Sequence, residues 1–373
     1  MTGRVDAEII GSFTSSPSSA AVRTDRSRFA AIWLFLLAGA VLAMVIVGGA
    51  TRLTGSGLSI TEWKPISGVI PPLSTAAWEH LFRLYQATPQ YRVLNPGMPL
   101  EAFKSIFWWE WAHRLLGRSV GLLFAVPFAA LCLLKRLPRR LIGPCLVLFA
   151  LGGIQGLAGW WMVMSGFENR VAVAPERLAT HLGLALVLLC ALIWSALEAW
   201  SGPPPPDGKP VGGWRLASGL FVCIVYVQCL LGALVAGNHA GLTNNDWPRM
   251  AEHWIPIDYW QGGIWATLAH GVAAVQFNHR VIAYGLLVFA LGLAGVGVRS
   301  TRLDIGARAL CAAAGALSLV QVMLGVATLV MIVPLPMAML HQATAVVLLG
   351  LAAVLAWSVQ RQSGTIIPLA ESD

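Results

Sequence analysis

The chain has 373 residues, of which 57% are hydrophobic and only 11% are charged. Soluble globular proteins carry about 25% charged residues, so this composition excludes an ordinary soluble domain and indicates an integral membrane protein. The formal net charge of +8 does not indicate nucleic-acid binding, because most basic residues lie between apolar segments, where they set membrane topology.

Residues 1–28 are polar and rich in Ser, Thr and Arg, so we expect a disordered N-terminus. A membrane-spanning helix needs about 20 apolar residues. Helices are favoured over a barrel because the sequence lacks the alternating pattern of barrel strands. The segments that meet the length requirement are 29–50, 113–134, 141–164, 178–198, 214–236, 280–298, 307–333 and 337–359. The sequence therefore predicts an all-α integral membrane protein with eight transmembrane helices.

Basic clusters orient these spans. They lie at residues 23–28, 135–140 and 299–308. The positive-inside rule then places both termini, including the tail 361–373, in the cytoplasm. The long segments 51–112 and 237–279 face outside. We expect a multi-pass protein of the inner (cytoplasmic) membrane, with the lipid bilayer as its solvent.

The chain divides into two similar halves, 29–200 and 214–360. The linker between them, 201–213, contains four consecutive prolines and is expected to be a stiff cytoplasmic spacer. Residues 110–114 read EWAHR and residues 276–280 read QFNHR, each at the start of an apolar run. Four spans per half is an even number, so the halves enter the membrane in the same direction. This predicts two parallel, pseudo-symmetric four-helix bundles.

Four histidines recur at equivalent places, the outer starts of the second span of each pair: His113, His181, His279 and His341. Two imidazoles per half, without cysteine or carboxylate, are too few for a closed zinc site. Two imidazoles from facing helices of a bundle suit a haem iron ligated on both faces. Glycines of the third span could make room for the ring: Gly152, Gly153, Gly156 and Gly159.

Arg114 and Arg280 directly follow two of these histidines, so each could bind a haem propionate or simply anchor its helix at the interface. The other histidines are expected to be solvated loop residues, with His270 the strongest exception: His80, His239, His253 and His270. The cysteines favour small buried apolar positions over a disulfide or zinc site: Cys132, Cys145, Cys190, Cys223, Cys229 and Cys311.

Four strings make the chain resemble the haem A synthase (Cox15/CtaA) family over roughly residues 30–360. They are GGATRLTGSGLS (48–59), EWKP (62–65), GVIPP (68–72) and EWAHR (110–114). The second-half string NNDWP (244–248) departs somewhat from the family pattern. One branch of the family carries cysteine pairs in its outer loops. This chain has none there, so it resembles the cysteine-free branch of proteobacterial and mitochondrial type.

The resemblance implies an oxidoreductase that converts haem O to haem A for terminal oxidases, by oxidising a ring methyl group to a formyl group in two steps. It implies haem b as cofactor, with His279 and His341 as axial ligands, and His113 and His181 as ligands of the substrate haem. A haem O synthase is the implied supplier of haem O. The electron partner is unidentified, and a homo-oligomer stays an open alternative.

Glu110 and Gln276 occupy matching places, each three residues before a histidine and so on the same helix face. A carboxylate can accept a proton or stabilise developing charge, and an amide cannot exchange a proton at neutral pH. This predicts that the first half reacts, with Glu110 catalytic. The alternative is that Glu110 forms a structural ion pair with Arg114 or Arg118.

Two other classes compete with this interpretation. A di-haem b electron-transfer protein, such as a quinol-linked cytochrome b, would use the same histidines without needing Glu110. A transporter with parallel repeats would place its polar groups near the middle of the membrane, whereas here they lie at the outer edge.

Overall fold

The computed structural model describes residues 26–168, 170–203 and 211–362. Every predicted span is confirmed as a helix long and apolar enough to cross a membrane. These helices are α2 (Arg28–Leu53), α5 (Leu100–Leu133), α6 (Arg139–Met164), α7 (Pro175–Ser201), α8 (Trp214–Gly237), α9 (Val272–Gly297), α10 (Ile305–Val330) and α11 (Leu335–Gln362). The described residues contain no β-strand. The predicted disordered N-terminus, proline-rich linker and tail lie largely outside the described residues.

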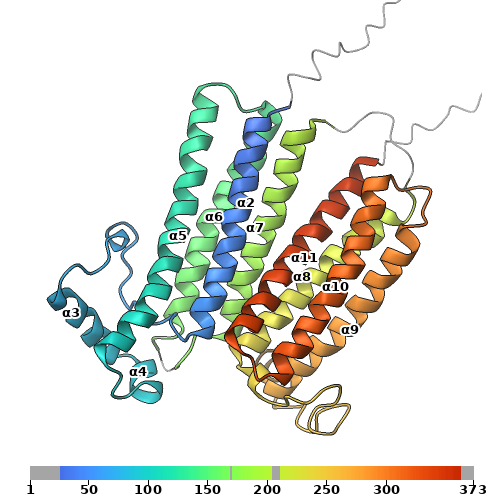
Figure 1. Ribbon diagram of the computed structural model, residues 1–373. Helices are drawn as coiled ribbons and strands as arrows, with labels where there is room; N and C mark the ends of the chain where they lie inside the picture. The colour runs from blue at the N-terminus through green and yellow to red at the C-terminus, as the bar shows by residue number, and fades with distance from the viewer. Residues whose placement is uncertain (1–25, 169, 204–210, 363–373) are drawn as a thin grey trace, which may run out of the picture.

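The helices form two neighbouring groups of four, α2 with α5–α7 and α8 with α9–α11 (Figure 1). The start of α2 and the end of α11 lie at one end of the molecule, which we call the terminal end. The opposite end carries the segments 54–99 and 238–271, and we call it the loop end. The turns α5–α6 and α9–α10, which hold two of the basic clusters, lie at the terminal end.

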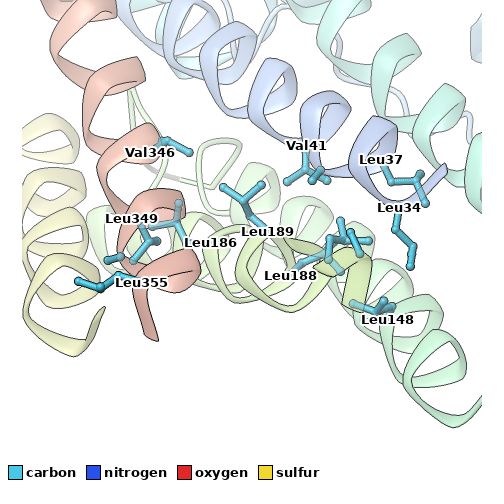
Figure 2. Close-up of a cluster of buried hydrophobic side chains, with 14 of the residues drawn as sticks. Leu34, Leu37, Val41, Leu148, Leu186, Leu188, Leu189, Val346, Leu349 and Leu355 are labelled. Atoms are coloured by element: carbon cyan, nitrogen blue, oxygen red, sulfur yellow. The ribbon is translucent and has the colours of Figure 1, made fainter. Parts of the chain in front are cut away.

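The groups meet along α7 and α11, which contact each other, with further contacts of α7 with α8 and of α11 with α2. Leu186 on α7 and Leu349 on α11 belong to one continuous buried cluster (Figure 2). A Cβ on Gly183 would lie 2.8 Å from the Tyr226 hydroxyl of α8, so the glycine permits this close approach. Small residues at helix contacts are typical of membrane bundles, where close packing rather than exclusion of water drives association.

A carboxylate clamp joins the groups at the terminal end. Glu198 on α7 pairs with Arg140 of α6 and Arg361 of α11, each at 3.4 Å. Trp357 of α11 also donates its indole N–H to Glu198 at 2.8 Å. One acidic residue thus satisfies donors from both halves.

Two helices extend well beyond their predicted spans. α5 begins at Leu100 and α9 at Val272, so His113 and His279 lie inside continuous helices rather than at helix ends. The sequence interpretation also treated residues 51–112 simply as a loop, although they contain α3 (Thr75–Gln86) and α4 (Pro89–Leu94). An aromatic cluster of Tyr85, Phe103 and Phe107 buries α3 against the extension of α5.

Candidate haem sites at the loop end

Each of the four histidine rings lies against a glycine of the preceding membrane helix. A Cβ would meet the ring carbon Cε1 at 2.9 Å for Gly48 and His113, for Gly159 and His181, and for Gly325 and His341. The distance is 3.2 Å for Gly232 and His279. Any larger residue would displace the ring, so the glycines are cradles for the imidazoles. Of the glycines singled out in the third span, only Gly159 has this role, since Gly152, Gly153 and Gly156 face open space.

Three of the rings also have a glutamine partner, located four residues before the cradle glycine. The Nε2 atoms of Gln155, Gln228 and Gln321 lie 3.1, 3.0 and 3.2 Å from Nδ1 of His181, His279 and His341. The same amides donate to the backbone carbonyl of their histidine at 2.9–3.0 Å. Sequence reasoning missed these glutamines, although the pattern Gln-x-x-x-Gly occurs in α6, α8 and α10 and was available as a signal.

The two rings of the second half face each other. The ring centres of His279 and His341 are 6.5 Å apart, and the ring planes are at 82°. A metal–imidazole bond is about 2 Å long, so two rings on opposite sides of one metal have centres roughly 6 Å apart. The observed spacing therefore fits a single metal between the rings. An apolar hollow of about 440 Å³ opens beside Val322 and Val326 of α10, which adjoin Gln321 and Gly325 in sequence.

In the first half, His113 of α5 and His181 of α7 lie within electrostatic range of each other. The structure thus brings the predicted ligands together as two pairs, one in each half. Among the described residues, no group of three or more His, Cys, Asp or Glu side chains could hold a metal ion. Paired imidazoles in glycine-lined cradles are a donor set that fits haem iron.

Glu110 is buried on α5, three residues before His113, and both of its carboxylate oxygens accept hydrogen bonds. Its Oε1 accepts from the Arg114 guanidinium at 2.6 Å, which is the ion pair expected under the structural alternative. Its Oε2 accepts from the Ser59 hydroxyl at 2.7 Å and from the Ile60 backbone N–H at 2.8 Å. Arg114 donates in addition to the Ile60 and Glu62 carbonyls. The pair fastens the segment after α2 across the loop end of the first half.

The second half fastens its loop segment in a similar way, but Gln276 donates hydrogen bonds to this segment, whereas Glu110 accepts them. The amide of Gln276 donates to the carbonyls of Ala240 and Thr243 at 2.9 and 2.8 Å. Arg280 donates to carbonyls of Asn244, Asp246 and Arg249. Both predicted propionate-binding arginines are thus occupied by loop carbonyls in this structure.

Asp246 stabilises the same second-half segment. Its carboxylate accepts from the Ala251 N–H at 3.0 Å and from the Glu252 N–H at 3.3 Å. The Ala251 hydrogen bond is the main cause of a lowered pKa for Asp246, to which the Glu252 N–H and Arg280 also contribute. The carboxylate therefore stays charged and holds a turn in which both residues have positive φ.

The remaining histidines lie apart from the pairs. His80, His239 and His253 are exposed at the loop end. His270 approaches Glu176 of α7 at 3.7 Å, and so connects the second loop segment to the first half. The six cysteines are unpaired and lie within α5, α6, α7, α8 and α10.

These features define an all-helical, multi-pass membrane protein with two paired-histidine sites suited to haem. A family model described as the cytochrome oxidase assembly protein COX15-CtaA matches residues 31–353, and the chain belongs to this family. A protein of Caulobacter vibrioides called heme A synthase is 55% identical, covering 91% of this chain and 98% of that protein. Proteins of the same name from Sinorhizobium fredii and Bradyrhizobium sp. (strain ORS 278) are 47% and 45% identical, covering 88% and 91% of this chain and 90% and 94% of their own lengths.

The description "cysteine-free" is wrong for the chain as a whole, which has six cysteines. All six cysteines lie within the membrane helices, so the described segments between these helices contain no cysteine.

The glycine cradles lead to a testable prediction. Gly325→Ala should push the His341 ring aside and weaken haem binding in the second half roughly tenfold or more, as expected for a misplaced ligand. Gly292→Ala on α9 is the matched control, because a Cβ there meets nothing within 4 Å. Haem titration of the purified proteins measures both. Equal haem affinity in the two variants would contradict the cradle role.

Proposed function

We propose that this chain is a haem A synthase, which oxidises a ring methyl group of haem O to a formyl group in two steps. The observation that carries the proposal is the pair of haem-suited sites in which Glu110 of the first half stands where the second half has Gln276. The names of its relatives support it. The product, haem A, serves terminal oxidases, in agreement with the family description of cytochrome oxidase assembly.

We assign haem b to His279 and His341 and the substrate haem to His113 and His181. Haem b, when bound, supplies a one-electron redox centre. The chain's own residues do the rest. The imidazoles would hold the two haems, and Glu110 and Arg114 fasten the segment after α2 at the loop end. Glu110 offers a carboxylate beside the substrate ligand, where it can accept a proton or stabilise charge as hydrogen leaves the methyl group.

A di-haem cytochrome b is not favoured, because relatives at 45–55% identity carry the name heme A synthase. We further infer that the protein lies in the inner membrane with both termini in the cytoplasm. A haem O synthase would supply the substrate, and a separate electron partner would complete the reaction.

Substitution of single ligands should separate the two sites. His279→Ala and His341→Ala should each remove the retained haem b, because one imidazole holds the iron weakly. His113→Ala and His181→Ala should leave haem b in place and stop conversion of haem O. Extraction and chromatography of haems after co-expression with a haem O supply measures both effects. Equal loss of haem b in all four variants would contradict separate sites.

Glu110→Gln tests the catalytic role of the carboxylate. The amide preserves volume, and its oxygen can accept from Ser59 and Ile60, but its NH2 group replaces the oxygen that accepts from Arg114. The second half holds Gln276 and Arg280 at the same places, so we expect a folded protein that retains haem b. Haem A formation should fall by about 10²–10⁴, the usual contribution of a general base, and haem O or a hydroxylated intermediate should accumulate.

Ser59→Ala is the matched control, since it removes one hydrogen bond to the same carboxylate and leaves the charge. Limited proteolysis of the segment 54–99 reports whether this segment remains docked. If both variants lose haem A in proportion to increased proteolysis, Glu110 acts only by fastening the segment.

The proposed topology is open to labelling in intact cells. A cysteine at exposed Pro96 should react with a membrane-impermeant maleimide from outside, and a cysteine at exposed Arg136, at the opposite end, should react only after lysis. The basic clusters of the terminal end are the reason for this expectation. If only the Arg136→Cys variant were labelled in intact cells, the protein would have the opposite orientation and the proposed topology would be wrong.

A further inference from the structure

One of the four histidines lacks the glutamine partner that the other three share. His113 lies in a glycine cradle like the others, but the residue four positions before Gly48 is Met44. Met44 lies on α2 near Gly117, one helical turn beyond His113, where a Cβ would be 3.5 Å from its methyl carbon. The thioether cannot donate a hydrogen bond and accepts one only weakly. The Nδ1 atom of His113 is buried and has no hydrogen-bond partner among the described residues.

The buried amide oxygens show what the three glutamines are equipped to do. The Oε1 atoms of Gln155, Gln228 and Gln321 are all buried and have no partner among the described residues. A histidine that binds a metal through Nε2 carries its proton on Nδ1. In this structure each amide NH2 group faces Nδ1 and donates to the backbone carbonyl of the same histidine. Rotation of the amide gives up the hydrogen bond to that carbonyl and brings the unused oxygen to the Nδ1 proton. Such a bond fixes the ring and makes the imidazole a stronger ligand, and its loss typically costs 10–100-fold in metal affinity.

We propose that Met44 makes His113 the weak, exchangeable ligand of the four, so that the first-half site binds and releases haem quickly while the second-half site retains it. This inference rests on the assignment of the first half to the substrate haem. A site that must accept haem O and release haem A needs a ligand that detaches, and a site for a resident cofactor does not. Met44 is thus a positioning residue that acts through the absence of a hydrogen bond.

The test follows haem release without turnover. Purified protein is loaded with ferric haem b as the probe, and transfer to excess apomyoglobin is recorded by absorbance. We expect a fast and a slow phase in the wild type, with the fast phase absent in His181→Ala. Met44→Gln should slow the fast phase by about 10–100-fold and leave the slow phase unchanged. Met44→Leu has a similar size without an amide and should release haem like the wild type.

The converse variant, Gln228→Met, keeps the inference testable even if Met44→Gln does not fold. Gln228→Met should speed the slow phase by a similar factor, because it gives His279 the environment of His113. The inference is overturned if Met44→Gln and Met44→Leu release haem at equal rates, or if Gln228→Met leaves the slow phase unchanged. Normal haem A synthesis with no effect of these substitutions overturns only this inference. If the release rates are as expected but the protein makes no haem A, only the proposed function is overturned.

Discussion

The contact between an imidazole ring and a glycine of the preceding membrane helix is the constraint on which the rest of the structure depends. A polar ring inside a membrane bundle needs a defined place and a polar partner, because lipid offers neither. Glycine allows the helix backbone to approach the ring edge, as at Gly159 and His181. The same two helices must then stay in register along their length, so the position of the ring fixes the packing of each helix pair.

The hydrogen bonds at the loop end also depend on this helix register. Glu110 and His113 share one helix face, and so do Gln276 and His279, so each fastening residue is placed by the same helix that carries a ligand. The carboxylate accepts hydrogen bonds from the chain after α2, whereas the amide donates to the chain after α8. The change from acid to amide therefore has a structural consequence as well as a chemical one. The two loop segments present opposite backbone groups at equivalent places.

Much of this arrangement could be predicted from the sequence, because the length of an apolar run and the repetition of the His-Arg motif are direct physical signals. The spans and the pairing of His279 with His341 follow from them. The starts of α5 and α9 were not predicted, because polar residues interrupt the apolar pattern of both extensions, as Glu101 and Lys104 do in α5 and Gln276 and Asn278 do in α9. The Arg114 contacts to Ile60 and Glu62 depend on how the loop returns over the bundle, which spacing alone does not encode.

The glutamines show where a repeat carries more information than its individual motifs. A single Gln in an apolar helix is ambiguous, but its recurrence four residues before a cradle glycine in α6, α8 and α10 marks a common function. The exception then becomes informative, because α2 keeps Gly48 and changes only the partner position, to Met44. The cradles are equivalent in the two halves, and under our proposal the missing amide at Met44 makes one ligand weaker than the others without moving its ring. If the proposal is correct, a scaffold with two similar halves holds one haem firmly and another transiently.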